Sequence, residues 1–524
     1  MKYSFLSWHT LIVLLCCNTS LVAQKILWEK SVGGKHSEHL LDAIPTADYG
    51  FILAGSSLSS KSGSIAGTNQ GDLDYWIWKM DEQGGMVWQK SFGGDGMDLL
   101  QKVKATPDGG WILAGTTTSK KSGDKTQEGF GLEDIWIIKL DATGNQEWQQ
   151  TFGGVGQDYL KTIVPTTDGY LIGATSSSDA VKDANGKAEN SFGNVDYWIL
   201  KINSKGKIQW QKTFGGVYAD HLTEILPNAE GYLVAGYSNS PDNGNKSQKQ
   251  RGMSDYWLIQ LNEEGNPLWQ KVIGGDKEDQ LKSVVKTKDQ GFLLLGNSDS
   301  GSSFDKTASN QKETDFWLVK IDAEANILWQ ENLAFTFRDV AVSVSESQDG
   351  TILLSGYGLP SKSQSKGEGV HDYLLCKLKP NGEEMWRRVI GSNGQEKLVK
   401  TIETRDGGYV LAGTSNGSAS GNKQSQSQAN DFWIVKLLDE QKDKTPKIPL
   451  EAFPNPTSGY TNVIVNFNIH QATCEVYDLS GRLVLTQKVA DKTVPVYLGN
   501  LPYGIYLIEV RTKENQGSVK VVKK

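Results

Sequence analysis

Hydrophobic and polar residues alternate along this chain in short runs that are separated by glycine-rich turns. The run Asp74–Asp81 is apolar at nearly every position, and the run Met86–Gly94 follows it after a break at Gly84 and Gly85. Short runs rich in aromatic and β-branched residues, bounded by Gly, Asn and Asp, are typical of β-strands joined by tight turns. The pattern predicts a β-hairpin with a glycine exit.

This hairpin recurs along most of the chain. Its second-strand tryptophan returns at intervals of 60, 60, 62, 59, 60 and 57 residues. The positions are Trp28, Trp88, Trp148, Trp210, Trp269, Trp329 and Trp386. A period this long and regular indicates a repeat architecture, in which each repeat is one supersecondary unit that packs on its neighbours.

Each repeat contains four strand-like runs. In the second repeat they are Leu99–Ala105, Trp111–Thr117, Asp134–Asp141 and Gln146–Phe152. Turn signals separate the first from the second run and the third from the fourth, and a long polar loop joins the second to the third. The pattern predicts a four-stranded antiparallel meander.

The third strand is apolar on both faces, so both faces must be covered. One tryptophan position recurs in it, at Trp76, Trp136, Trp198, Trp257, Trp317 and Trp433. The two tryptophan positions together hold thirteen of the sixteen tryptophans, which favours packing between repeats over ligand stacking. Four-stranded sheets packed radially cover both faces without long open edges, which predicts a β-propeller.

The two ends of the repeat region complement each other. A fourth-type strand, Ile26–Val32, precedes the first complete set, and the last third-type strand, Asp431–Leu437, has no fourth strand after it. Seven third-type strands begin with an aspartate: Asp74, Asp134, Asp196, Asp255, Asp315, Asp372 and Asp431. We therefore predict an all-β fold with a seven-bladed β-propeller over 24–438, in which the N-terminal strand completes the last blade.

The sixth repeat departs from the others. Ala334 and Phe335 replace the usual Gly-Gly pair, Ala325 replaces the glycine of the hairpin turn, and Leu374 replaces the third-strand tryptophan. Sequence drift and a seam with its own surface both account for these changes.

After the repeats the periodicity stops. Residues 439–447 form a charged linker, and residues 448–524 form a second unit of short alternating runs. The expected strands are Asn462–Asn468, Thr473–Tyr477, Leu483–Val489, Val494–Leu498, Gly504–Arg511 and Gly517–Val522. Six or seven short strands in so few residues predict a small β-sandwich.

The N-terminal residues and the overall composition indicate the compartment in which the protein works. Residues 1–23 combine Lys2, an apolar run and small residues before Gln24, which indicates a secretory signal peptide cleaved after Ala23. No later segment has the length of a membrane helix. The net charge is −7 and the basic residues are scattered, which argues against a nucleic-acid surface. Cys376 and Cys474 lie in different predicted domains and are expected to be unpaired, buried thiols.

Two resemblances extend this interpretation. A Thr-x-Asp-Gly-Gly turn, an Asp-x-Trp strand and a Trp-Gln-Lys-x-Phe-Gly-Gly strand alternate over residues 26–437, and this repeat resembles the surface propeller repeats common in secreted proteins of the Bacteroidetes. The final unit resembles a type IX secretion C-terminal sorting domain (type A). The residues that carry this likeness are Pro454, Asn455, Pro456, Gly459, Tyr477, Asp478, Gly481, Arg482, Gly504 and Tyr506, with a basic end at Lys520, Lys523 and Lys524.

The sorting-domain resemblance implies a destination. It implies export across both membranes by the type IX secretion machinery, removal of the sorting domain, and either release or anchoring at the outer face of the outer membrane. The same Pro-Asn-Pro and Ser-Gly residues are also ordinary turn formers, which is the structural alternative.

An acid follows each fourth-strand tryptophan by ten residues. These acids are Glu38, Asp98, Asp158, Asp220, Asp279, Asp339 and Glu396. They precede the first strand of each repeat, so we expect a ring near one mouth of the propeller channel. Seven unpaired carboxylates would repel one another, by roughly 1–2 kcal/mol per neighbouring pair. The ring therefore either caps backbone N–H groups or binds cations or a ligand.

Other candidate groups have structural interpretations. The third-strand aspartates present the same choice between capping and binding. A lysine repeats on the third strand, at Lys79, Lys139, Lys201, Lys320, Lys377 and Lys436, and is expected to be paired or to snorkel. His36 and His39 flank Glu38, whereas His221 follows Asp220 in a different blade, which argues against a shared metal site.

The long loops between second and third strands emerge on the same face as the acids. They are polar and poor in aromatic residues, which weakens a sugar-binding interpretation and favours solvated, variable loops. The segment Asp183–Glu189 resembles a calcium loop but lacks the ligand spacing of an EF-hand, so calcium is an alternative and no cofactor is expected.

These observations favour a non-catalytic binding module that recognises a glycan or protein ligand through its loop-bearing face. The acids are arranged symmetrically, whereas catalysis normally needs an asymmetric constellation. The alternatives are a hydrolytic or polysaccharide-processing enzyme that uses acids at the channel mouth, and a purely structural surface protein.

Overall fold

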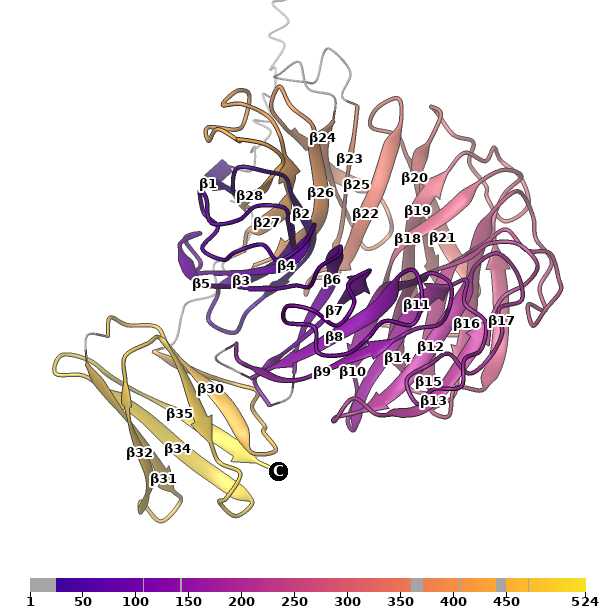
Figure 1. Cartoon of the computed structure of the whole chain (residues 1–524). Coiled ribbons are helices and arrows are strands. Elements are labelled where there is room, and N and C mark those ends of the chain that lie inside the picture. The colour runs from indigo at the N-terminus through magenta and orange to yellow at the C-terminus, as the bar shows by residue number, and fades with distance from the viewer. Residues whose placement is uncertain are drawn as a thin grey trace, which may run out of the picture.

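The computed structural model describes residues 25–524 except 107, 142–143, 360–370, 405–406, 440–448 and 470. In these residues the fold is all-β, with strands and no helix (Figure 1). The expected signal peptide and almost all of the expected linker lie outside the described residues. The repeat region contains propeller-like four-stranded antiparallel sheets, each built from consecutive strands with one exception.

The strands have the following bounds. The first consecutive sheets are β2(Glu38–Pro45) β3(Phe51–Ser57) β4(Asp74–Met80) β5(Met86–Phe92), then β6(Asp98–Ala105) β7(Trp111–Thr117) β8(Asp134–Leu140) β9(Gln146–Phe152), and β10(Asp158–Pro165) β11(Gly169–Ser176) β12(Asp196–Asn203) β13(Ile208–Phe214). The next are β14(Asp220–Asn228) β15(Gly231–Ser238) β16(Asp255–Leu261) β17(Pro267–Ile273), then β18(Asp279–Lys286) β19(Phe292–Ser298) β20(Asp315–Ile321) β21(Ile327–Leu333), and β22(Asp339–Glu346) β23(Ile352–Gly358) β24(Asp372–Leu378) β25(Glu384–Ile390).

The exceptional sheet joins the two ends of the repeat region. It contains β26(Glu396–Glu403), β27(Tyr409–Ser415), β28(Asp431–Leu438) and β1(Lys25–Val32), and β1 pairs antiparallel with β28 from Lys25↔Leu438 to Val32↔Phe432. The first strand of each sheet contacts the first strand of the next, and β26 contacts β2. The sheets therefore follow one another around a ring with the first strands innermost (Figure 1).

Aromatic residues join neighbouring sheets. The ring of Tyr75 lies 4.9 Å from that of Trp136 in the next sheet, and its hydroxyl donates to the Trp136 carbonyl at 3.0 Å. The contact recurs around the ring, and Phe432 of the last sheet packs on Trp76 of the first at 4.8 Å. Large aromatic side chains that fill the space between sheets bury much apolar surface per residue, so this packing holds the ring together.

The sixth repeat compensates for its missing tryptophan. Leu374 leaves room beside Phe316, and Phe335 fills it, with the two phenyl rings 5.1 Å apart. The guanidinium of Arg387 lies over the other face of Phe335, 4.8 Å from the ring centre. Phe335 therefore packs in the core of this sheet, beside Phe316 and Leu374.

The C-terminal unit contains two sheets. One holds β29(Leu450–Phe453), β30(Tyr460–Val465) and β33(Thr493–Tyr497), and the other holds β32(Leu483–Val489), β31(Ala472–Asp478), β34(Gly504–Arg511) and β35(Gln516–Lys523). Strand β29 is additional to the six runs predicted individually. Alternate residues of both sheets fill one core that includes Val463, Val476 and Ile508.

Both described cysteines are unpaired and buried, as expected. The described part of the chain contains no helix that could span a membrane.

Candidate functional site

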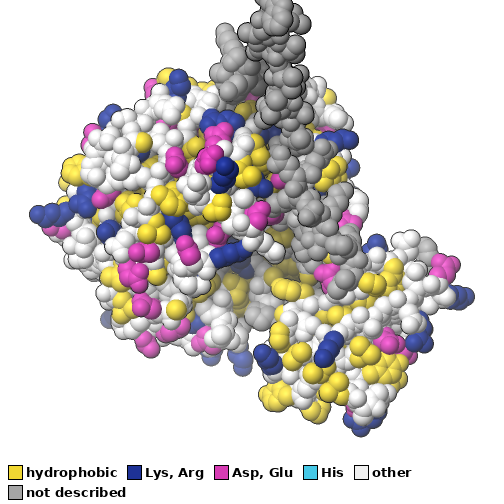
Figure 2. Space-filling view, turned by 180° about the vertical axis from the view of Figure 1, so that it is seen from behind, with side chains coloured by type: hydrophobic (Ala, Val, Ile, Leu, Met, Phe, Trp, Pro, Cys, Tyr) yellow, Lys and Arg dark blue, Asp and Glu magenta, His cyan; other side chains and the backbone are white. Residues whose placement is uncertain are grey.

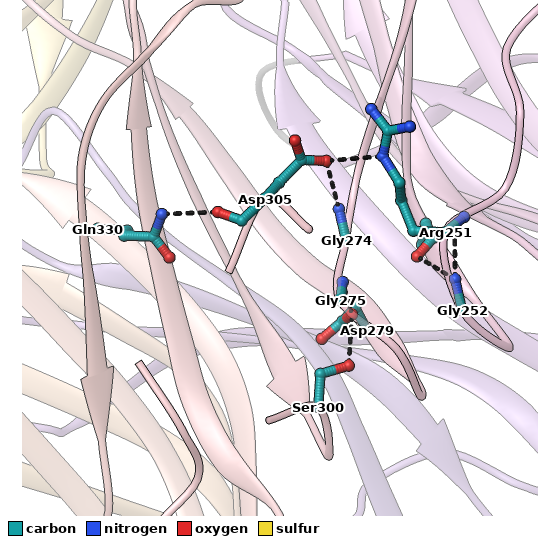
Figure 3. A network of polar contacts seen from close by, with 9 residues as sticks. Arg251, Gly252, Gly274, Gly275, Asp279, Ser300, Asp305 and Gln330 are labelled. Atoms are coloured by element: carbon teal, nitrogen blue, oxygen red, sulfur yellow. Dashed lines mark hydrogen bonds and ion pairs between the residues drawn. The ribbon is translucent and has the colours of Figure 1, made fainter. Parts of the chain in front are cut away.

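The seven acids expected before the first strands are the first residues of those strands, and all seven are fully buried. Each carboxylate accepts the backbone N–H group of the residue four positions before it, for example Gly94 N to Asp98 at 2.8 Å and Gly154 N to Asp158 at 2.8 Å. Nearby hydroxyl groups donate as well. Thus Ser300 Oγ is 2.9 Å and Gly275 N is 2.6 Å from Asp279 Oδ2 (Figure 3).

The same hydrogen bonds occur at Asp339 and Glu396, where the Gly-Gly pair is not kept. Asp339 accepts Phe335 N–H at 2.8 Å, although phenylalanine replaces glycine there. Glu396 accepts Ser392 N–H at 3.0 Å and Ser415 Oγ–H at 2.8 Å. The acids therefore close the turn between one sheet and the next with their own backbone donors.

The third-strand aspartates form a second set beside the first. Asp134 Oδ2 accepts Phe130 N–H at 2.7 Å, so it holds the end of the loop before its strand. Its other oxygen lies against Gly153, where an added Cβ would be only 1.9 Å from Oδ1. The same close approach occurs at Gly93, Gly215 and Gly274, with distances of 2.0, 1.9 and 1.9 Å to the corresponding aspartate. The first glycine of the Gly-Gly pair is thus required by a carboxylate.

Burial and mutual repulsion raise the pKa of these acids. The pKa is raised to about 6 at Asp74, Asp134, Asp196 and Asp255. Burial is the main cause, and repulsion from the first-strand acid of the next sheet contributes to the same shift. Burial also raises the pKa of Glu38 to about 7, with a smaller contribution from Asp431. Backbone and hydroxyl donors oppose these shifts without cancelling them.

Buried lysines in the long loops were not anticipated from the sequence. They are Lys125, Lys187, Lys246, Lys306 and Lys423. Each lies near a first-strand acid and the third-strand acid of its own sheet, and its ammonium group donates inside the loop, as Lys187 Nζ does to Ser178 O at 2.7 Å and Ser191 Oγ at 2.8 Å. In the sequence, the available signal was a lysine that recurs two residues after Gly123, Gly244 and Gly421.

In five sheets a glutamine on the fourth strand fixes the loop to the third-strand tryptophan, and Glu29 takes this place beside Trp433. Gln211 Oε1 accepts Trp198 Nε1–H at 2.9 Å and Ala188 N–H at 3.0 Å, while its Nε2 donates to Gly186 O at 3.1 Å. Gln89, Gln149, Gln270 and Gln330 do the same. Figure 3 shows Gln330 Nε2 donating to the loop carbonyl of Asp305, whose side chain receives Gly274 N–H and Arg251 Nε–H. The loops were expected to be solvated and variable. Their bases are instead held by these hydrogen bonds and contain buried lysines.

The tips of this face carry exposed apolar side chains. Leu132 is 64% exposed, Val155 62%, Tyr218 55% and Met253 60%. Loop ends and Gly-Gly turns of adjacent sheets meet here, because Leu132 N–H donates to Gly156 O at 3.1 Å and Met253 N–H to Lys277 O at 2.8 Å. The two residues after each Gly-Gly pair differ in every repeat, and they supply Val155, Val217, Tyr218 and Phe337.

The repeated third-strand lysines lie at the opposite end of the sheets and are paired, as expected. Lys139 Nζ is 2.9 Å from both Asp108 and Glu147, and Lys320 Nζ is 2.7 Å from Asp289. For Lys79, Lys139, Lys201 and Lys320 an acid partner comes from the turn between the first and second strands. Lys377 instead pairs with Asp439. These lysines close hairpins and leave no free charge for a ligand.

Among the described residues, no group of three or more His, Cys, Asp or Glu side chains is placed so that it could hold a metal ion. In the loop with calcium-like composition, Asp183 accepts Asn185 N–H at 2.9 Å and Lys187 lies inside the loop.

The sorting-motif residues build turns of the C-terminal unit. Asp478 accepts N–H groups of Ser480 and Arg482 at 2.9 and 3.1 Å, and the Tyr506 hydroxyl donates to Pro502 O at 2.7 Å. Tyr477, Asp478, Gly481 and Tyr506 also line a cavity of about 440 Å³. Lys523 of the basic end is buried and donates to Leu498 O and Gly499 O, both at 2.8 Å.

Comparison with known proteins agrees with this division. Residues 451–524 match the family described as "Secretion system C-terminal sorting domain". The repeated four-stranded sheets and this tail define an exported all-β protein with propeller-like repeats. Its C-terminal unit is a type IX sorting domain, and such a tail directs secretion or attachment at the cell surface.

The repeat region is similar to other proteins at low identity. The regulatory protein FlaEY of Caulobacter vibrioides is 24% identical over 240 residues, which is 43% of this chain and a quarter of that protein's length. Among solved structures, the Pan2 WD40 domain of Neurospora crassa covers 80% of this chain and 98% of its own, with 10% identity and a TM-score of 0.41. Hydrazine synthase of Kuenenia stuttgartiensis covers 74% and 93%, with 8% identity and a TM-score of 0.40.

Proposed function

We propose that this protein is a seven-bladed propeller with a C-terminal β-sandwich, exported by type IX secretion, and that it acts as a non-catalytic binding module at or beyond the cell surface. Seven four-stranded sheets in the described part of the repeat region and the pairing of β1 with β28 support the blade count. The packing of a three-stranded on a four-stranded sheet supports the sandwich.

The exposed apolar tips carry the binding proposal. Exposed apolar side chains that gather on one face mark interaction sites more often than scattered ones do. Here they project from loop bases that buried lysines and the Trp–Gln pairs hold in place, so little conformational entropy is lost on binding. By contrast, charged groups of both signs are interspersed over the visible surface in Figure 2, which does not suggest a nucleic-acid partner.

The burial of the acid ring supports the non-catalytic part of the proposal. A catalytic acid must reach its substrate, whereas these seven carboxylates are fully buried and hold backbone N–H groups. The ligand class that best fits the tips is a protein or glycan with an apolar face, since Tyr218, Phe192 and Phe337 offer exposed rings.

The test is an array of glycans and proteins probed with the full chain. We expect a ligand whose binding falls at least tenfold in Val217→Ser/Tyr218→Ser, because both apolar contacts lie in one turn. Leu328→Ser on the outer strand β21 removes an equally exposed apolar group and is the matched control. An array without ligands would favour a structural surface protein, and hydrolysis of an array glycan would favour an enzyme.

A further inference from the structure

We propose that the innermost strands form a binding site for a multivalent oxyanion, a phosphate or sulfate group, on the axis of the propeller. The site is built around Lys102, Lys161, Lys282 and Lys400, which we call the axial lysines. They lie on β6, β10, β18 and β26. This site is separate from the loop face of the proposed function.

A β-bulge in each first strand sets the direction of these side chains. The ladder between β10 and β11 shifts register between Leu160 and Thr162, so Lys161 is the extra residue, and Lys282 occupies the same place on β18. Lys102 and Lys400 come immediately after the equivalent shift on β6 and β26. A bulge re-aims the side chains beside it, and the contact of Lys102 with Glu224 shows that a side chain just after the shift reaches across to another inner strand.

Contacts between non-neighbouring strands show that side chains meet on the axis. Lys102 Nζ on β6 lies 3.8 Å from Glu224 Oε2 on β14, although β10 separates these strands in the ring. Thr162 on β10 donates its hydroxyl proton to Glu224 between them. Side chains from three consecutive inner strands therefore converge at one level.

The positive charge at this level exceeds its partners. Two acids, Glu224 and Asp42, face the four lysines: Glu224 pairs with Lys102, and Asp42 attracts Lys102 and Lys400. The Asp42 oxygens also accept Ala43 N–H at 2.9 Å and Val103 N–H at 3.1 Å. Within the described chain, Lys161 and Lys400 form no ion pair, and Lys282 donates only to Gln280 Oε1 at 3.0 Å and lies over the Tyr237 ring at 5.4 Å.

The axial lysines also repel one another. Burial is the largest cause of the lowered pKa of Lys161, Lys282 and Lys400. Lys102 lowers the pKa of Lys161 further, and Lys161 lowers that of Lys282, where Glu278 opposes the shift. At Lys400 the attraction of Asp42 opposes the repulsion from Lys102. Elsewhere the fold gives its buried lysines a carboxylate or carbonyl partner, as at Lys139 and Lys187. Partly buried ammonium groups without partners are costly, and an oxyanion with several acceptor atoms would supply the missing charge.

His221 faces the same group of residues. Burial, followed by repulsion from Lys161 and Lys282, lowers the pKa of His221 to about 4, so its imidazole is neutral at pH 7. It stacks on Tyr237 with ring centres 4.9 Å apart. A neutral imidazole adds a hydrogen-bond donor for the anion without adding to the repulsion.

The experiment measures the melting temperature of the full chain in phosphate, sulfate and chloride at equal ionic strength. We expect phosphate and sulfate to raise the melting temperature by several degrees above chloride, because ligands that bind only the folded state stabilise it. Lys161→Gln/Lys282→Gln should abolish this rise while melting in chloride at the same temperature as the wild type or higher, since the substitution removes repulsion.

Lys212→Gln/Lys271→Gln on the outer strands β13 and β17 removes the same charge and should keep the full response. Glucose 6-phosphate, compared with glucose, distinguishes a group on a larger molecule from the free ion. A rise with glucose 6-phosphate assigns the site to phosphorylated compounds, and a rise with phosphate alone assigns it to the free ion. No rise over chloride in the wild type, or an unchanged rise in the axial variant, would overturn the proposal.

Discussion

At the scale of single residues, one glycine in each repeat is explained by its neighbour's carboxylate. Gly153 has no need of a left-handed backbone, and it is glycine because Asp134 Oδ1 occupies the place of a side chain. The first glycine of each Gly-Gly pair is therefore needed for packing against the aspartate, which a turn motif alone does not show.

Gly153→Ala tests this requirement. The new Cβ would overlap Asp134, so we expect a loss of about 1–3 kcal/mol in the free energy of unfolding, which denaturant titration measures. Gly301→Ala is the control, because the nearest atom to its Cβ would be 4.0 Å away. Equal stability of the two variants would contradict the packing argument.

The raised pKa values of the acids predict a dependence of stability on pH. A carboxyl group whose pKa is near 4 when unfolded and about 6 when folded holds its proton more tightly in the folded state, so stability falls as pH rises from about 4 to 6. The window extends to about 7 for Glu38. We expect a higher melting temperature at pH 5 than at pH 7.5.

A substitution at one acid isolates this effect from net charge. Asp134→Asn keeps an acceptor for Phe130 N–H but no longer titrates, so the difference in melting temperature between pH 5 and pH 7.5 should shrink. Glu264→Gln, an exposed group with the same change in charge, should leave the difference unchanged. A melting temperature that rises from pH 5 to pH 7.5 in the wild type would contradict the prediction.

At the scale of elements, each long loop between the second and third strands has a fixed base and a variable tip. Gln211 joins the third-strand tryptophan to the loop base with three hydrogen bonds. The sheet with Leu374 in place of tryptophan also has Arg387 in place of glutamine. This paired loss indicates that the tryptophan and the glutamine act as a unit.

Gln211→Ala should release the loop that it holds. Because the Trp198 indole N–H and the Gly186 carbonyl lose their partner, we expect faster hydrogen exchange of backbone amides in residues 177–195 and a loss of about 1–3 kcal/mol in stability. Gln209→Ala, at an exposed position two residues earlier, should change neither measurement. Unchanged exchange in Gln211→Ala would show that the loop is held by other contacts.

The sixth repeat provides a test of compensation within one sheet. Phe335→Gly restores the usual Gly-Gly residue but empties the space beside Leu374, so we expect a loss of about 3–5 kcal/mol in the free energy of unfolding. Adding Leu374→Trp should recover part of the loss, because the indole refills the cavity. Denaturant titration of the two variants and the wild type measures both effects, and a stable single variant would refute the coupling.

At the scale of the whole molecule, most of the strand order and strand bounds could be predicted from the sequence. The strand runs of the second repeat match β6–β9 within a residue, because a period of 60 residues averages out local ambiguity. The acids, the third-strand lysines and the unpaired thiols were also found from position alone.

The rest depended on partners that the repeat does not reveal. Each fourth-strand glutamine meets its loop only after folding, as Gln211 meets Ala188, 23 residues earlier, in a loop whose remaining residues vary. The axial lysines were hidden because a bulge breaks the strand alternation by one residue, and they differ from repeat to repeat. A symmetric consensus finds what the repeats share, whereas candidate binding residues lie where they differ.

The pairing of β1 with β28 has a consequence for assembly. The segment that completes the last sheet is the earliest described part of the chain, so the circle stays open until residues near 438 have emerged and folded. Until then β1 has no partner strand, and its bare edge of N–H and C=O groups could pair with a strand of another chain. Export that delivers the whole polypeptide to one compartment before closure would shorten the life of that edge and guard against aggregation.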